Sequence, residues 1–432
     1  MTNSNINSDF YLRRLPVLAT ILLFLSSLFY LYSFSYGVLV CLVAMSFLLC
    51  LFKDEVASAV GIFLLANNVI LAIAFFMQDG IVSYLWNGQF DQYYIKVLFL
   101  ESIFWGIFII GCGKKSGLSG MNGIINKKNN FLMVSSIIFL FIGIPFLVSD
   151  IIISSSSYFI SYVEFSSTGT VAYESGAAFV AFAIFLRVGK KVPTYHLLLE
   201  LLAVLLILYI AIGSGKRLPL AYPIFAYTVW IAYTYGRLLA GLVYFGIALS
   251  GYIFGIVRDA MVLQSVSADV LLSGLKYTNQ GATLHASAVY VRIVDENLIS
   301  TTDQLISFAS NLILATFMSL SALPDVARIN EYAMSYYDVQ GNGGVIGAYS
   351  YFFLDWIGPF VLPLFLVWMF RSRGATAALA FGFVAVMSPR WTLYNIGPAL
   401  RVLGLVAGMI FLLIIFDVRR FTSRRKFSRH MP

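Results

Sequence analysis

Repeated apolar stretches long enough to cross a membrane are the feature that most constrains this chain. A membrane-spanning helix needs about 17–25 mainly apolar residues. Twelve stretches approach or meet that length: 16–35, 37–52, 56–77, 93–112, 131–149, 172–188, 196–213, 219–236, 239–257, 346–370, 375–388 and 397–416. The sequence therefore predicts an all-α, multi-spanning membrane protein with about twelve transmembrane helices.

The composition excludes an ordinary soluble protein. Hydrophobic residues make up 60% of the chain and charged residues only 11%, whereas a soluble domain is about 45–50% apolar and about 25% charged. No soluble core could bury this much apolar surface, so most side chains must face lipid or other helices. We expect residues 1–432 to form a single integral membrane domain.

The placement of Lys and Arg predicts the orientation of the chain. With the N-terminus in the cytoplasm, most of the 28 Lys and Arg residues fall in cytoplasmic loops or in the basic tail, 417–432. This arrangement satisfies the positive-inside rule, so both termini are expected in the cytoplasm. The same placement argues against nucleic acid as the reason for the net charge of +8.

Two polar segments are then expected on the outer side of the membrane. Residues 150–169 form an outer loop rich in serine and aromatic residues, and residues 258–345 form the largest polar segment, between the ninth and tenth helices. Within the larger segment, residues 305–325 are apolar enough to suggest a further span. We predict an amphipathic or interfacial helix there, because another span would place the basic tail outside.

The motifs of common soluble enzymes and metal sites are missing from the sequence. It contains no GxxxxGK[ST], HExxH or GxSxG motif. Cys41, Cys50 and Cys112 lie inside apolar stretches, far from any spacing that binds a metal. The sequence therefore predicts neither a metal nor another cofactor.

Basic residues are sparse on the expected outer side, and several of them are arginines at helix ends. They are Lys216, Arg217, Arg258, Lys276, Arg292, Arg328, Arg390 and Arg401. A guanidinium group grips two phosphate oxygens at once and keeps its charge, so an arginine cluster at a membrane surface suits a diphosphate. The alternative is that each side chain extends separately to lipid phosphates.

A reaction at this surface would also need a group that accepts a proton. The outer-side candidates are Asp259, His285, Asp295, Glu296 and Asp325. Asp259 and His285 are the named catalytic candidates, although the Asp259 carboxylate adjoins Arg258 and could simply hold that arginine in place. Tyrosines in the outer segments could hold sugar rings, or they could belong to the aromatic belt of a membrane protein.

Three stretches of the chain resemble segments of the bacterial O-antigen (Wzy-type) polysaccharide polymerases. "IAIGSGKRLPLAYPIFAY" is similar to the small-residue segment with an arginine that joins two central helices in that family. "FMSLSALPDVARINEY" resembles the loop segment in which an arginine closely follows a proline. "GNGGVIGAYSYFFLDWIGPFVLPLFLVWMFR" resembles the Gly-rich start of the next helix. With the late outer segment, the resemblance spans most of the chain.

The resemblance implies a GT-C-like enzyme of lipopolysaccharide biosynthesis in the inner membrane. Such an enzyme transfers a growing glycan from undecaprenyl diphosphate to a new lipid-linked repeat unit, and a chain-length regulator and a flippase would be its partners. The family's arginines correspond to Arg217, Arg328 and Arg390 by their segments, and to Arg258 by position. These four residues are the expected diphosphate-binding groups.

Two other functions stay open at this point. An O-antigen ligase, or another lipid-linked glycosyltransferase, would share the architecture but usually carries a loop motif with a histidine, which the surroundings of His285 do not reproduce. A sugar-lipid flippase or other transporter would show related halves and, in a two-half carrier, a long central cytoplasmic loop. Neither feature is visible in the sequence.

Overall fold

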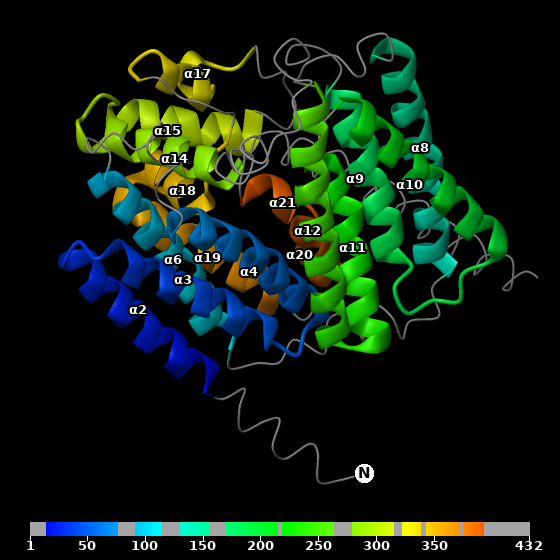
Figure 1. Cartoon of the computed structure of the whole chain (residues 1–432), viewed down its shortest axis with the longest axis horizontal. Coiled ribbons are helices and arrows are strands. Elements are labelled where there is room, and N and C mark those ends of the chain that lie inside the picture. Colours follow the sequence, from blue (N-terminus) through cyan, green and yellow to red (C-terminus); the bar gives the residue numbers. More distant parts are fainter. Residues whose placement is uncertain are drawn as a thin grey trace, which may run out of the picture.

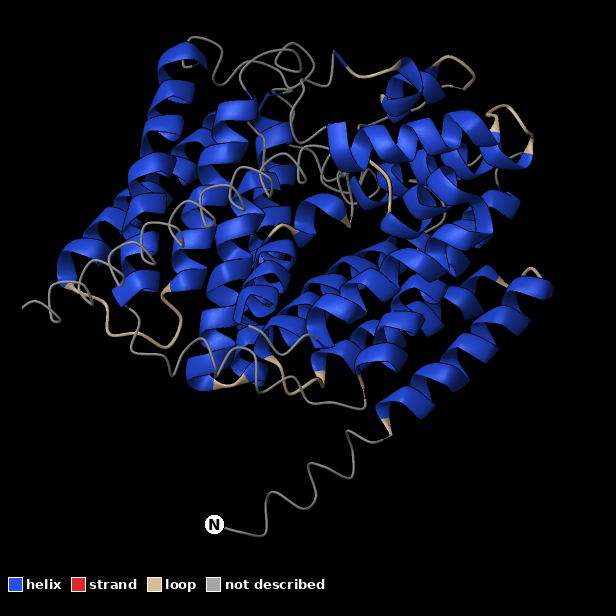
Figure 2. Ribbon diagram, turned by 180° about the vertical axis from the view of Figure 1, so that it is seen from behind, coloured by secondary structure: helices blue, strands red, loops and turns tan. Residues whose placement is uncertain are grey.

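The chain is all-helical wherever the structure describes it. The computed structural model describes residues 14–76, 91–113, 130–154, 170–214, 218–262, 279–314, 322–337, 343–371 and 375–392. Within these ranges there are helices and turns but no strand (Figure 2). Five helices are long and apolar enough to cross a membrane: Glu55–Ala72, Asp91–Cys112, Leu132–Ser154, Thr194–Ser214 and Ile346–Arg371. The prediction of an all-α chain is therefore confirmed for the described part, and five of its helical stretches have the length and composition that crossing a membrane requires.

The first four helices pack into one group together with a late helix. They are α2 (Leu15–Leu31), α3 (Ser35–Cys50), α4 (Glu55–Phe76) and α6 (Asp91–Cys112), joined by α19 (Gly358–Arg371). Helix α6 lies at the centre and contacts α2, α3 and α19. Figure 1 shows these helices inclined in the same direction, in blue, cyan and orange. Side chains such as Phe24, which is 62% exposed, cover the outside of the group, as expected where helices face lipid.

The next five helices form a second group. They are α8 (Asn130–Ser154), α9 (Thr170–Leu186), α10 (Thr194–Ser214), α11 (Leu218–Tyr235) and α12 (Arg237–Val262). Helices α8 and α9 cross so closely that a Cβ atom at Gly143 would lie 3.0 Å from the carbonyl oxygen of Gly176. Small residues allow this close approach in membrane proteins, where packing rather than water drives helix association.

The large polar segment folds into packed helices. It contains α14 (Asn279–Asp295), α15 (Thr301–Ala309), the π-helical turn η4 (Ser310–Leu314), the 3-10 turn η6 (Asp325–Ala327) and α17 (Ile329–Met334). Helix α14 buries Leu284, Val289 and Ile293 against α6 and α18 (Ile346–Leu354). Figure 1 shows α14 and α15 lying across the upper end of the first group. Of the interfacial helix expected at 305–325, residues 305–314 are helical, and residues 315–321 lie outside the described part.

Helices lie over the expected apolar ranges up to residue 388, with three differences. Helix α8 was expected to end at residue 149 but continues to Ser154, into the expected outer loop 150–169. Helix α12 was expected to end at residue 257 but continues to Val262, so Arg258 and Asp259 lie in its last turns. The expected helix 346–370 is broken into α18, the 3-10 turn η7 (Asp355–Ile357) and α19. Asp355 has a φ of 50°, and a Cβ atom at Gly358 would clash with the backbone carbonyl of Ser350. The chain therefore turns too tightly there for a continuous helix. The expected helix 397–416 lies outside the described residues.

The two groups meet at a short helix near the end of the described chain. Helix α20 (Ala375–Val386) contacts α4, α9 and α19, and it leads into α21 (Ser388–Trp391), which contacts α11. The indole ring of Trp391 stacks on that of Trp105 in α6, with ring centroids 6.0 Å apart. The backbone N–H of Ile346 donates to the carbonyl of Thr392, 3.2 Å away. Helix α21 is thereby held between both groups (Figure 1).

The side of the membrane occupied by α14 and α15 gives a direct test of the predicted orientation. A reporter enzyme fused after Asp303, in the first turn of α15, should be active only as a periplasmic reporter, because the charge distribution places this segment outside. Parallel fusions after Lys190 and in the basic tail should report the cytoplasm. Cytoplasmic activity of the Asp303 fusion would contradict the orientation and every proposal that depends on it.

Candidate functional site

Arg390 is the expected diphosphate-binding residue whose surroundings the structure describes most fully. Its Nε atom lies 3.1 Å from Oε1 of Glu174, and the hydroxyl of Tyr222 donates to the same oxygen over 2.7 Å. The side chains of Arg390 and Glu174 are 18% and 12% exposed, while Tyr222 is fully buried. We call these three residues the Arg390 cluster. It is a charged pair at the edge of an apolar interior and still reached by solvent.

Helix ends position the Arg390 cluster. Glu174 lies in the second turn of α9, Tyr222 lies in the second turn of α11, and Arg390 lies in α21. Pro389 is in the first turn of α21, where its fixed φ and missing N–H suit the start of a helix. Arg217 directly precedes Leu218, the first residue of α11. The cluster thus lies one helical turn from the point where the chain carrying Arg217 enters α11.

Buried polar groups surround α21 on the side of α18. The rings of Tyr349 and Tyr290 have centroids 5.3 Å apart, and the Tyr290 hydroxyl donates to the carbonyl of Gly343 over 3.2 Å. Tyr349 lies in α18, whose first residue, Ile346, donates from its backbone N–H to the carbonyl of Thr392, next to α21. Within the described part of the chain, Oγ of Ser388 is buried without a hydrogen-bond partner. Other helices of the described part hold such atoms as well, for example Oγ of Ser26 and of Ser135.

The structure gives the other expected diphosphate-binding arginines different surroundings. Arg328 pairs with Asp325 and Glu331, three residues to either side of it, so both ion pairs stay within its own surface segment. Arg258 lies in α12, but its side chain is outside the described part, as is that of Asp259. Arg217 lies outside the described residues, together with Lys216, Lys276 and Arg401.

The expected proton-accepting residues of α14 hold that helix in place. His285 is 5% exposed, and its Nδ1 atom lies 2.6 Å from the Tyr94 hydroxyl of α6. Asp295 pairs with Lys96 of α6 over 2.6 Å and accepts a hydrogen bond from Tyr351 of α18 over 2.7 Å. These contacts fasten α14 to α6 and α18.

The neighbouring carboxylate, Glu296, also makes structural contacts within the large segment. It accepts hydrogen bonds from Arg292, over 2.7 Å, and from the hydroxyl of Tyr337. The hydrogen bond from Tyr337 is the largest cause that lowers the pKa of Glu296, and Arg292 adds to it. These contacts tie Glu296 to its own helix end and to the surface segment that carries Tyr337.

The sequence arguments missed Glu174, because they considered only acids in the polar outer segments. Glu174 is the sole charged residue between Thr170 and Leu186. A lone acid inside an apolar helix is costly unless it is paired, so its position was itself a signal of a partner elsewhere. The sequence could not say that this partner is Arg390.

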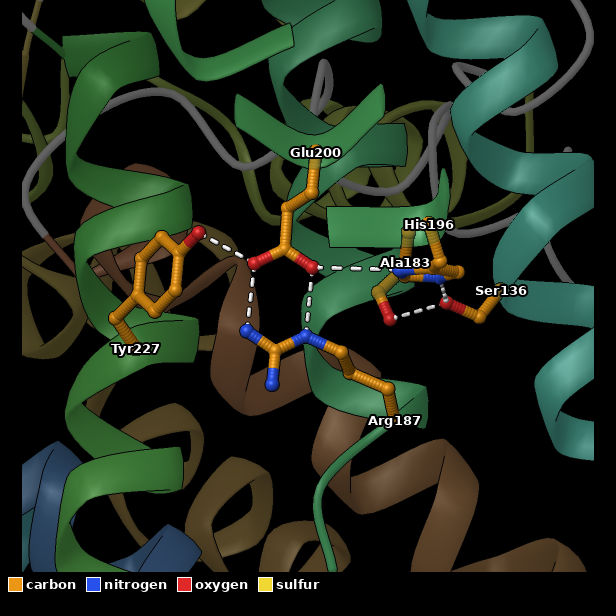
Figure 3. A network of polar contacts seen from close by, with 6 residues as sticks. All are labelled: Ser136, Ala183, Arg187, His196, Glu200 and Tyr227. Atoms are coloured by element: carbon orange, nitrogen blue, oxygen red, sulfur yellow. Dashed lines mark hydrogen bonds and ion pairs between the residues drawn. The ribbon is translucent and has the colours of Figure 1, made fainter. Parts of the chain in front are cut away.

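A second buried network lies at the opposite ends of α9 and α10 (Figure 3). Arg187 makes a two-pronged ion pair with Glu200, with both N–O distances 2.6 Å. The hydroxyl of Tyr227 donates to Glu200 over 2.5 Å. On the other side, Nδ1 of His196 lies 3.7 Å from Glu200, and Nε2 lies 2.8 Å from Oγ of Ser136. The network joins α8, α9, α10 and α11.

Among the described residues, no group of three or more His, Cys, Asp or Glu side chains could hold a metal ion. Comparisons of the chain with protein-family models, with curated proteins and with solved structures gave no match.

Proposed function

We propose that this protein is a polysaccharide polymerase of the O-antigen type. It transfers a growing glycan from undecaprenyl diphosphate to a new repeat unit on a second lipid carrier. In this proposal the chain crosses the inner membrane about twelve times in a GT-C-like arrangement. Both termini lie in the cytoplasm, and the Arg390 cluster faces the periplasm.

The Arg390 cluster is the observation that carries the proposal. An arginine at the edge of the apolar interior suits a leaving diphosphate, because guanidinium keeps its charge and binds phosphate oxygens in pairs. Charge stabilisation is worth most in a water-poor site, where the leaving group becomes negative during the reaction. Arg390 is only slightly exposed, and its cluster includes Tyr222 near the start of α11, which Arg217 directly precedes. We therefore assign both arginines to binding the diphosphate.

Deletion of the gene tests the proposal against its alternatives. A strain that lacks a polymerase keeps lipopolysaccharide carrying one repeat unit but loses the ladder of longer chains. Complete loss of the O-antigen would instead indicate a ligase or a flippase, and an unchanged ladder would exclude all three functions. Restoring the ladder with the gene on a plasmid is the control.

Arg217→Lys should severely impair polymerisation while the protein still accumulates in the membrane. Lysine keeps the charge but lacks the planar fork that grips two phosphate oxygens. If Arg217 only reached for lipid phosphates, lysine would serve equally well. A full-length ladder from Arg217→Lys at wild-type protein levels would therefore remove Arg217 from the site.

A further inference from the structure

Glu174 holds a place that a residue activating the acceptor would need. Its carboxylate contacts Arg390, the described arginine proposed to bind the diphosphate, and it remains partly exposed. Tyr222 donates a hydrogen bond to Oε1 of Glu174 and so fixes the direction of the carboxylate. Helix α9, which begins four residues earlier, provides a rigid support for it.

The described acids that the sequence nominated have other partners. Asp295 is tied to Lys96 and Tyr351, Glu296 to Arg292 and Tyr337, and Asp325 to Arg328. These contacts join elements of the large segment to one another or to α6 and α18. In contrast, the ion pair of Glu174 leads directly to the proposed diphosphate site.

We propose that Glu174 is the catalytic base that takes the proton from the acceptor hydroxyl. This inference rests on the proposed polymerase function and adds a named residue to it. The acceptor is a free hydroxyl of the sugar in the incoming lipid-linked repeat unit.

The proposed step balances as a single displacement. The acceptor O–H bond breaks and its proton moves to the Glu174 carboxylate, while the acceptor oxygen forms a bond to the anomeric carbon of the donor glycan. The bond between that carbon and the diphosphate oxygen breaks, and undecaprenyl diphosphate leaves with the electron pair. Arg390 and Arg217 stabilise its new negative charge. Because attack and departure occur on opposite faces of the carbon, the anomeric configuration is inverted.

The contact between Glu174 and Arg390 agrees with a role for Glu174 as the base and for Arg390 as the group that binds the diphosphate. An arginine has five N–H donors in one plane, more than a single carboxylate oxygen can accept. One guanidinium can therefore contact the base on one edge and phosphate on another. In this arrangement the base and the leaving diphosphate would lie on either side of the anomeric carbon.

The test uses the full-length protein in proteoliposomes, supplied with undecaprenyl-diphosphate-linked repeat units extracted from the deletion strain. Glu174→Gln keeps the size and hydrogen-bonding ability of the side chain but removes the base. It should lower kcat by ~10²–10⁴, while the KM for the lipid-linked unit stays close to that of the wild type. Glu174→Asp, which keeps a carboxylate, should be more active than Glu174→Gln.

Glu331→Gln is the matched control, because Glu331 is also paired with an arginine, Arg328, but lies on the exposed surface. It should leave kcat unchanged. If Glu174 only positions Arg390, the Gln variant, whose amide oxygen can still accept from the guanidinium, will keep a kcat near that of the wild type. That result, or equal activities of the Asp and Gln variants, overturns the inference.

The two proposals fail in different ways. Wild-type protein that does not lengthen the lipid-linked units would disprove the polymerase function. Active wild-type protein, with an inactive Arg390→Lys variant and a fully active Glu174→Gln variant, would disprove only the role of Glu174.

Discussion

A variant in which alanine replaces Arg390 should insert into the membrane and accumulate but fail to lengthen glycans. The change removes the charge proposed to balance the leaving diphosphate, and it separates Glu174 from the guanidinium 3.1 Å away. Loss of one group that stabilises charge in a transition state typically costs ~10²–10³ in rate. The expected result is lipopolysaccharide with single repeat units, measured as the glycan ladder of the complemented deletion strain.

The Arg390→Lys strain should also lose most of its glycan ladder, because an ammonium group is a point charge and cannot bind two phosphate oxygens as the planar guanidinium does. Arg237→Ala is the control for this series. Arg237 is the first residue of α12, and its side chain donates to the backbone carbonyl of Leu51 over 2.9 Å. It follows the last turn of α11, whereas Tyr222 lies near the first turn of that helix. The Arg237 variant should keep the ladder. A normal ladder from Arg390→Ala at wild-type protein levels would remove α21 from the proposed active site.

Glu200→Ala should destabilise the protein more than any other single change considered for the helix bundle. The side chains of Arg187 and Glu200 are only 6% and 3% exposed, so removal of the carboxylate leaves a buried cation without its counter-ion. Breaking a buried ion pair in this way costs about 3–5 kcal/mol. We expect a lower melting temperature in detergent and a smaller amount of protein in the membrane.

The same physical argument predicts a rescue. The triple variant Arg187→Met, Glu200→Leu and Tyr227→Phe removes both charges and the hydroxyl that would lose its acceptor. Replacement of a whole buried ion pair by apolar residues of similar volume is often neutral or stabilising. The triple variant should therefore melt at a higher temperature than Glu200→Ala. If Glu200→Ala melts like the wild type, the network in Figure 3 does not support the bundle.

The helices of this protein could largely be predicted from its sequence, because apolar stretches of sufficient length have few alternatives to a helix. Helix α14 was the exception. Its sequence, "NQGATLHASAVYVRIVD", mixes polar and small residues and lacks a long apolar run. Its burial comes from contacts with α6 and α18, which only the tertiary structure supplies. The same contacts turned His285 from an expected loop residue into a buried side chain.

The candidate site could be predicted only in part. The rule that an arginine in an apolar layer is costly unless it is paired singled out Arg390, and the structure pairs it with Glu174. The identity of the partner depended on which helix ends meet, and sequence spacing carries no information about that. Glu174 and Tyr222 belong to helices that start far apart in the chain and come together only where α9, α11 and α21 pack.

The separation of paired charges along the chain has a consequence for biogenesis. Arg187 and Glu200 are 13 residues apart, so their pair can form as soon as α9 and α10 have left the ribosome. Lys96 and Asp295 are 199 residues apart, and Glu174 must wait until α21, which carries Arg390, has been made. Until the later helices have been made, Lys96 and Glu174 lack the counter-ions that they have in the folded protein. A chain that stops before α21 would therefore already hold the Arg187–Glu200 pair at one end of α9, while Glu174 near the other end would still be an uncompensated carboxylate.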